Sequence, residues 1–343
     1  MSFNAWKTHI EEGDTVIVHI SRNNMQTIVV KKGEEFTSRY GNFKHDKMIG
    51  KEYGSKMVST NYKGFVYLLH PTPELWTLSL PHRTQILYIA DISFITTYLD
   101  MKPGSRVIES GTGSGSFSHS IARAIGPTGK LYTFEYHEQR AEQARKEFND
   151  HGLGDIIQLQ HRDVCKDGFG LKDAVNAVFL DLPAPWEAVA SAKETFIQHR
   201  TGKICCFSPC IEQVAKTVEA LNSNGFVDIT MYECLVRSYD LMPTRKVTFE
   251  EAIEKAKLGQ GVLPKKRSSE EVNEENDRKN QIWVTKTPVE TRGHTSYLTF
   301  ATFLPAIDTN LAPPPTPALS SSPPSTESPV PENNEKGSDQ PAA

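Results

Sequence analysis

Between residues 106 and 233, short apolar runs alternate with longer stretches in which apolar residues recur every three or four positions. The short runs are rich in β-branched residues such as Val107, which is typical of buried strands. The longer stretches have helical spacing, and Phe117, Ile121 and Ile125 would share one helix face. This alternation predicts a doubly wound, mostly parallel α/β sheet of Rossmann-like type, with helices on both faces.

The same pattern sets the expected bounds of each element. Strands are predicted at residues 106–110, 130–135, 156–161, 175–181, 202–207, 226–233 and 295–303. Helices are predicted at residues 83–100, 116–125, 137–151, 186–198 and 209–223. Pro103 and Gly104 are expected to stop the first of these helices, because neither residue continues a helix well.

The segment before this region has a different pattern, with short alternating runs separated by Gly and Asn turns. It predicts a small antiparallel β domain, followed by a stiff connector at residues 70–73 that contains two prolines. The tail is too poor in apolar residues to order itself. The expected divisions are a β domain at 1–75, an α/β domain at 76–303 with a flexible charged insertion near 245–290, and a disordered Pro- and Ser-rich tail at 304–343.

Charge distribution changes the picture only slightly. The 343 residues carry a formal net charge of −4, and five acids against one base in the tail account for that value. The nearly neutral body disfavours a strongly cationic single-chain nucleic-acid binder, although it is compatible with a local basic groove. A partner subunit could supply further positive surface. The run Lys265-Lys-Arg267 has three open interpretations, namely a solvated loop, an RNA contact or a nuclear import signal.

Membrane and metal sites find little support in the sequence. No apolar run reaches the roughly 18–20 residues of a membrane-spanning helix, and we expect no secretory signal. Five cysteines favour a reducing compartment over a disulfide framework. Cys205 and Cys206 are interpreted as strand residues, and with Cys210 they match no zinc spacing, so no metal is expected.

A glycine-rich turn follows the strand at 106–110 and carries the strongest chemical signal. Gly111, Gly113 and Gly115 allow positive φ and a close approach of the backbone to a ligand, just before a helix N-terminus. The dinucleotide pattern would place its third glycine where Ser116 stands, so a nicotinamide dehydrogenase is disfavoured. Glu135 ends the next strand and is well placed to accept hydrogen bonds from ribose hydroxyls. These residues predict a nucleotide-type cofactor site.

The turn from Ile108 to Ser116 resembles the S-adenosylmethionine turn of class I methyltransferases. More narrowly, the chain resembles the catalytic subunits of eukaryotic tRNA (adenine-58-N1)-methyltransferases from about residue 1 to residue 303, outside 245–290. Further segments carry this likeness: His70–Thr77, Leu80–Tyr88, Phe179–Trp186, Phe207–Gln213 and Gly293–Ala301. The resemblance implies S-adenosyl-L-methionine as cofactor, adenine N1 at position 58 of the tRNA T-loop as target, a homologous non-catalytic partner subunit in a heterotetramer, and a nuclear location.

Taken with the strand ends, the resemblance yields a set of cofactor-binding residues. Glu135 and Arg140 are assigned to the ribose, Asp163 with the Val164 backbone to the adenine, and Glu109 to the methionine end. Leu87 is placed near the cofactor by the family likeness alone. The full set is Leu87, Glu109, Ser110, Gly111, Thr112, Gly113, Ser114, Gly115, Ser116, Glu135, Arg140, Asp163, Val164 and Asp181.

The loop Asp181-Leu-Pro-Ala-Pro-Trp186 resembles the acidic proline loop that class I enzymes use on amino or ring nitrogens, except that Ala184 separates its two prolines. Asp181 is predicted to be the catalytic residue, accepting a hydrogen bond from the adenine amino group as positive charge develops on the ring. Two roles stay open for Trp186, which could stack on a base or cap the core.

Candidates for contact with substrate RNA are less specific, since each could serve only packing or the surface. They are Arg22, Arg39, Tyr40, Arg83, Gln85, Tyr88, Pro183, Ser208 and Pro209. Two alternatives remain beside the tRNA enzyme, namely a class I methyltransferase acting on another RNA, a protein or a small molecule, and a catalytically silent RNA-binding subunit. The intact glycine turn and Asp181 favour a catalytic chain over the silent one.

Overall fold

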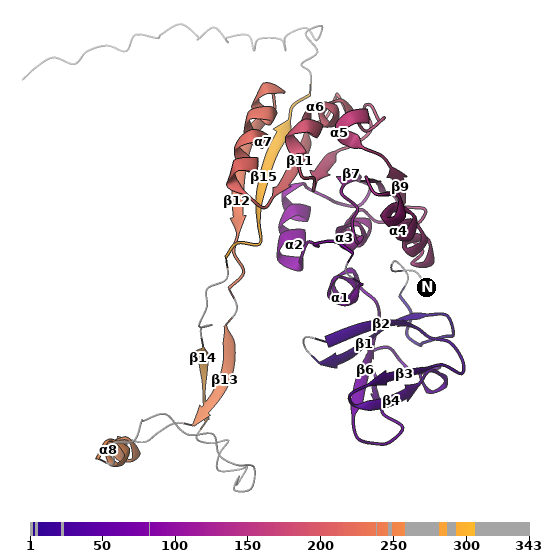
Figure 1. Cartoon of the computed structure of the whole chain (residues 1–343), viewed down its shortest axis with the longest axis vertical. Helices are drawn as coiled ribbons and strands as arrows, with labels where there is room; N and C mark the ends of the chain where they lie inside the picture. The colour runs from indigo at the N-terminus through magenta and orange to yellow at the C-terminus, as the bar shows by residue number, and fades with distance from the viewer. Residues whose placement is uncertain are drawn as a thin grey trace, which may run out of the picture. The chain divides into compact units, whose positions relative to one another are not determined.

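The computed structural model describes residues 3, 6–21, 24–81, 83–237, 239–245, 249–257, 281–286 and 293–305. Near the N-terminus, the described strands form an antiparallel sheet in the order β2-β1-β6-β5 (Figure 1). Its strands are β1 (Thr15–Ser21), β2 (Asn24–Val29), β5 (Lys56–Val58) and β6 (Phe65–Leu69). A β-hairpin of β3 (Glu35–Ser38) and β4 (Gly41–Lys44), followed by a short 3-10 helix at His45–Lys47, completes this region.

The central sheet has the strand order β12-β15-β11-β10-β7-β8-β9 among the described residues. Only β15 runs antiparallel, between β11 and β12, so the prediction of a mostly parallel doubly wound sheet is confirmed. The order of strands along the sheet reverses between β7 and β10, which is where such sheets bind ligands. The strands are β7 (Arg106–Ser110), β8 (Lys130–Glu135), β9 (Ile157–His161), β10 (Ala177–Leu180), β11 (Gly202–Ser208), β12 (Val227–Cys234) and β15 (Ser296–Phe303).

Helices cover both faces of this sheet because successive strand residues point to opposite sides. Val107 packs into one buried cluster with residues of α2, α3 and α4, whereas the adjacent Ile108 packs into a second cluster with residues of α5 and α6. Leu221 of α7 belongs to that second cluster. The bounds are α2 (Ile89–Tyr98), α3 (Ser116–Ile125), α4 (Glu138–Asp150), α5 (Val164–Asp167), α6 (Pro185–Thr195) and α7 (Ile211–Ser223).

The connection between the sheets differs from the expected one in two ways. The stiff connector predicted at residues 70–73 leads directly into a helix that the sequence analysis did not predict, α1 (Pro73–Ser79), and Thr72 caps this helix by accepting a hydrogen bond from the Leu75 amide. A helix was expected from residue 83, but α2 begins at Ile89. Residues 83–88 have no regular secondary structure, because backbone groups of Arg83 and Leu87 bond to the glycine turn rather than to a helix of their own.

The insertion near 245–290 contains regular elements that the sequence pattern did not predict. β13 (Asp240–Arg245) pairs antiparallel with β14 (Gln281–Lys286), and α8 (Phe249–Lys257) lies between them in sequence. The run at 265–267 and the predicted tail from 306 onward lie outside the described residues, and the expected domain boundaries stay predictions. No described helix is long and apolar enough to span a membrane.

Candidate functional site

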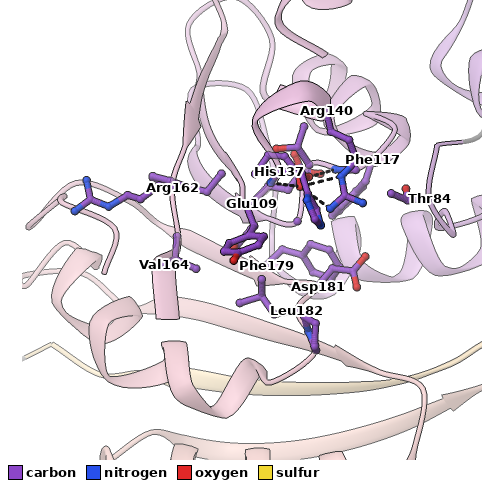
Figure 2. A pocket seen from close by; sticks show the side chains of 18 of the residues that line it. Thr84, Glu109, Phe117, His137, Arg140, Arg162, Val164, Phe179, Asp181 and Leu182 are labelled. Atoms are coloured by element: carbon purple, nitrogen blue, oxygen red, sulfur yellow. Dashed lines mark hydrogen bonds and ion pairs between the residues drawn. The ribbon is translucent and has the colours of Figure 1, made fainter. Parts of the chain in front are cut away.

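A cavity of about 560 Å³ opens at the carboxyl ends of β7, β8 and β10, where the strand order reverses (Figure 2). This volume falls within the range of small-molecule sites. Every residue of the predicted cofactor set except Gly115 lines the cavity. Its walls also contain apolar side chains that the sequence analysis did not assign, including Phe117, Phe134, Phe179 and Leu182.

The glycine turn needs its glycines for two different reasons. Gly111 has φ +96°, and a Cβ there would lie 2.2 Å from the backbone oxygen of Asp181, so the two loops touch through backbone alone. Gly115, also at positive φ, is the N-cap residue of α3 and lies outside the cavity lining. Gly111 therefore shapes the cavity, and Gly115 sets the start of the helix behind it.

Glu135 braces the turn from the end of β8. Its carboxylate accepts hydrogen bonds from the backbone amides of Gly113 (2.9 Å) and His137 (3.0 Å). It also forms an ion pair with Arg140, with 2.9 Å between the guanidinium and the carboxylate, and its side chain is buried. The two residues predicted to hold the ribose are thus already fixed in place beside the turn.

Glu109 lies deeper, under the same turn. Its carboxyl oxygen Oε2 accepts hydrogen bonds from the hydroxyls of Ser118 (2.6 Å) and Thr133 (2.7 Å). Burial raises the pKa of this carboxyl to about 7, although the two hydroxyl bonds act in the opposite direction. Glu109 is therefore poised between its neutral and charged forms near neutral pH.

Asp181 follows β10, packs against the backbone of Gly111 and lines the cavity (Figure 2). Burial and, second, the negative charge of Glu135 raise the pKa of the Asp181 carboxyl to about 7. Within the described part of the chain, no group donates a hydrogen bond to this carboxylate. A carboxyl group with a shifted pKa and unused hydrogen-bonding capacity in a cavity is a candidate for binding or proton transfer.

Asp163 and Val164 form the far wall, at the start of α5. The Asp163 carboxylate caps this helix by accepting a hydrogen bond from the Cys165 amide (3.2 Å) and lies 3.3 Å from the Lys166 ammonium. Val164 is buried beside it. The cavity thus offers carboxylates at several strand ends, separated by apolar surface, which suits a ligand with both polar and apolar parts.

The structure separates the predicted RNA residues. Gln85 and Pro183 line the cavity, and Tyr88 is exposed next to it, before α2. Ser208 is fully buried, so a contact between its side chain and RNA does not fit this structure; the next residue, Pro209, accepts a hydrogen bond from His294 through its carbonyl. Arg39 and Tyr40 are in the β3–β4 hairpin and do not line the cavity. Arg22 lies outside the described residues.

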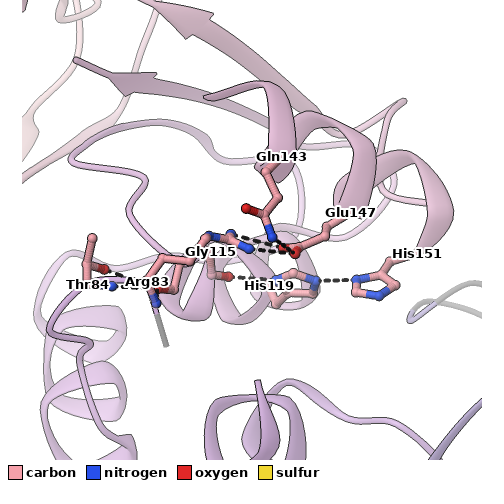
Figure 3. A network of polar contacts seen from close by, with 8 residues as sticks. Arg83, Thr84, Gly115, His119, Gln143, Glu147 and His151 are labelled. Atoms are coloured by element: carbon pink, nitrogen blue, oxygen red, sulfur yellow. Dashed lines mark hydrogen bonds and ion pairs between the residues drawn. The ribbon is translucent and has the colours of Figure 1, made fainter. Parts of the chain in front are cut away.

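A polar network behind the turn was missed by the sequence analysis (Figure 3). The buried His119 ring bonds through Nδ1 to the Gly115 carbonyl (2.6 Å) and through Nε2 to Nδ1 of His151 (2.8 Å). Because a carbonyl only accepts, Nδ1 of His119 carries a proton and its Nε2 accepts from His151. Burial lowers the pKa of His119 to about 3 and that of His151 to about 4. In the sequence, the one local indication of this network is that Gly115 and His119 are four positions apart, which brings them together on a helix.

The sheet order and the carboxylate-lined cavity at the glycine turn define a class I methyltransferase fold. Two solved structures have it. An S-adenosylmethionine-dependent O-methyltransferase from Thermotoga maritima is 25% identical with a TM-score of 0.67, and the match covers 86% of this chain and 94% of that chain. The tRNA (m1A58) methyltransferase TrmI from Aquifex aeolicus is 22% identical with a TM-score of 0.62, covering 87% and 100%.

The chain belongs to the family described as the tRNA methyltransferase complex GCD14 subunit, which matches residues 64–303. A TrmI-like N-terminal family matches residues 9–56. A catalytic subunit of tRNA (adenine(58)-N(1))-methyltransferase from Candida albicans is 44% identical over 89% of this chain and 99% of its own length. A Cryptococcus neoformans relative of the same name is 53% identical over 72% of this chain, and the match spans only 57% of that relative.

Proposed function

We propose that this chain is the catalytic subunit of an S-adenosylmethionine-dependent tRNA methyltransferase that modifies N1 of adenine, at position 58 of the T-loop. The observation that carries the proposal is Asp181, a carboxyl group that lines the cavity beside the glycine turn and receives no hydrogen bond from the described residues. The Candida albicans relative with this printed activity matches 89% of the chain, which supports the same target here. A catalytically silent subunit would have no need for such a group.

The cavity residues fit the cofactor by their chemistry. Gly111 lets the Asp181 backbone pack directly against the turn, and α3 directs free amide groups toward the turn. Glu135 and Asp163 offer carboxylate oxygens to ribose hydroxyls and to an adenine amino group. Glu109 and Asp181 offer negative charge to the cationic methionine end. When bound, S-adenosylmethionine supplies an electrophilic methyl group on a sulfonium.

Asp181 then has a defined task toward the substrate base. As adenine N1 forms its new bond, positive charge develops on the ring, and a carboxylate beside the amino group stabilises that charge through a hydrogen bond. The same carboxylate can take an amino proton from the cationic product. Pro183 and Pro185 restrict the loop that carries Asp181, which helps to hold a base within attack distance. No nucleophilic side chain is required.

A homologous non-catalytic partner, in a heterotetramer, is part of the proposal. The two-stranded sheet of β13 and β14 supports it, because Leu241 and Trp283 are 66% and 67% exposed on an element that is marginal by itself. The near-neutral body of the chain also suits a complex in which another subunit supplies positive surface for tRNA. We further propose that the complex works in the nucleus, which imaging of the tagged full-length chain would test.

The test is transfer of a tritiated methyl group to unmodified tRNA, with and without the candidate partner, followed by nucleoside analysis. We expect 1-methyladenosine in wild-type tRNA and none in tRNA with guanosine at position 58. We also expect weak activity of the chain alone. Methylation of another nucleoside would point to the alternative, a methyltransferase for a different target, and rapid specific turnover without a partner would contradict the two-subunit proposal.

A further inference from the structure

One wall of the cavity is a segment without regular secondary structure, residues 83–88, which we call the strap. The serine hydroxyls of the glycine turn hold it. Ser114 Oγ accepts hydrogen bonds from the Arg83 amide (3.0 Å) and the Thr84 amide (3.2 Å), and Ser116 Oγ donates to the Leu87 carbonyl (3.2 Å). Thr84, Gln85, Ile86 and Leu87 line the cavity. The strap and the turn are therefore one structural unit around the ligand site.

An ion pair fixes the strap from the other side (Figure 3). The Arg83 guanidinium donates two parallel hydrogen bonds to the Glu147 carboxylate, at 2.5 and 3.0 Å. Both side chains are mostly buried, with 11% and 18% exposed. Glu147 is on α4, the helix that also carries Arg140, the partner of Glu135. The ion pair thus connects the strap to the part of the molecule that braces the ribose side of the cavity.

This geometry changes the assignment of Arg83. An arginine side chain that is 11% exposed and whose two terminal nitrogens both bond to one carboxylate presents little charge to a phosphate backbone. Removing Glu147 leaves the arginine uncompensated in a partly buried position, and removing Arg83 does the same to the glutamate. Either change should release the strap from α4 while leaving the outer surface of the protein nearly intact.

We infer that Arg83 and Glu147 are positioning residues for cofactor binding, which act by holding the strap against the glycine turn, and that Arg83 is not an RNA contact. This inference rests on the proposed function for the identity of the cofactor. The two alternatives for Arg83 have opposite consequences. A phosphate contact would make loss of Arg83 weaken tRNA binding and would make loss of the acidic Glu147 neutral or favourable. A positioning pair makes both losses weaken cofactor binding alike.

The experiment measures two affinities for each variant of the full-length chain, in complex with its partner where one is needed for folding. Calorimetry gives the Kd of S-adenosylmethionine, and methyl transfer gives the KM of tRNA. For Arg83→Met and Glu147→Gln we expect the cofactor Kd to rise by about tenfold and the tRNA KM to stay within about twofold. The double variant should bind the cofactor at least as tightly as the single variant with the higher Kd, because no unpaired charge remains.

The chain offers a matched control in a second bidentate arginine–glutamate pair. Arg123 of α3 pairs with Glu74 of α1, but these side chains are 49% and 40% exposed and neither lines the cavity. Glu74→Gln should leave both constants unchanged. Arg83→Lys keeps the positive charge without the two parallel hydrogen bonds of the guanidinium, so it should give an intermediate cofactor Kd. Thermal unfolding of each variant shows that the measurements were made on folded protein.

Each outcome has a definite meaning. Unchanged cofactor Kd in Arg83→Met and Glu147→Gln would overturn the inference, as would a raised tRNA KM with stronger salt dependence in Arg83→Met alone. Should the arginine variants fail to fold, Ser114→Ala removes the strap anchor by another route, and an unchanged cofactor Kd there would also overturn it. Failure of the wild-type protein to bind S-adenosylmethionine would instead refute the proposed function.

Discussion

Titratable groups are buried on both sides of the glycine turn, but the two sides differ in whether these groups have hydrogen-bond partners. On the cavity side, the Asp181 carboxyl has a pKa raised to about 7 and receives no hydrogen bond from the described chain. On the rear side, His119 has a pKa lowered to about 3, and both of its ring nitrogens are engaged. A shifted pKa is therefore common to a group that lines the cavity and to one that does not. On our proposal, unused hydrogen-bonding capacity toward the cavity is what distinguishes Asp181.

The largest effect should follow from Asp181→Ala, which removes the carboxyl group that we propose acts on the substrate base. We expect methyl transfer to fall by roughly 10²- to 10³-fold, because charge on the base loses its stabilising carboxylate. The Kd of S-adenosylmethionine should change by only a few-fold in calorimetry. The exposed Asp155→Ala is the control. Normal kcat in the Asp181 variant would remove this residue from the mechanism.

Next in size is Gly111→Ala, which tests whether close backbone approach shapes the cavity side. The new Cβ would lie 2.2 Å from the Asp181 carbonyl, so the two loops must separate. We expect cofactor affinity to fall at least ~10-fold and stability to fall by about 1–3 kcal/mol, measured by calorimetry and denaturant unfolding. Gly33→Ala is a matched control, since Gly33 also has positive φ but nothing within 4 Å. Retained affinity in the Gly111 variant would contradict the assignment.

On the rear side, His119→Phe keeps an aromatic ring but removes the side-chain bond to the Gly115 carbonyl and leaves Nδ1 of His151 without its partner. We expect a stability loss of about 1–3 kcal/mol in denaturant unfolding, whereas kcat well below the unfolding temperature stays within a few-fold. The exposed His199→Phe should change neither quantity. A variant of His119 that lost activity while keeping its stability would place the rear side in catalysis after all.

The smallest effect concerns pH, where the two sides should have opposite slopes. The folded-state pKa of Asp181 exceeds its ordinary value of 3.8, so its contribution to stability is lost as pH rises from about 4 through 7. For His119 and His151 the folded-state pKa lies below 6.5, so their contribution is lost as pH falls below that value. Asp181→Asn should therefore gain about 1–2 kcal/mol more stability at pH 8 than at pH 5, in denaturant unfolding. Equal gains at both pH values would rule out the raised pKa.

Much of the fold was predictable because it depends on local periodicity. The bounds of β7, β8 and α3 match the expected ranges, and carboxylates at parallel strand ends had to meet at one edge of the sheet. The strap, by contrast, is held by Ser114 and Glu147, which are 31 and 64 positions away from Arg83. Such contacts override the helical spacing that predicted a helix from residue 83, and no local pattern contains them.

Local rules also missed the elements of the insertion. β13 and β14 pair across more than thirty intervening residues, and their exposed apolar side chains do not follow the alternation expected of a strand on a buried core. The helix at Pro73–Ser79, however, could have been found, since Thr72 followed by proline is a common helix start. Helix caps can thus be predicted from neighbouring residues, whereas contacts between distant segments can be seen only in the folded chain.

The position of β15 has a consequence for how the chain is made. This strand, the last one among the described residues, lies between β11 and β12, so both have an open edge until residues 296–303 have left the ribosome. A nascent chain that stops before then exposes two unpaired strand edges. It also exposes the apolar residues that Leu298 and Phe300 would have covered. Synthesis of the methyltransferase sheet therefore completes in a single late step, and truncations ending before Ser296 should aggregate rather than yield a smaller working enzyme.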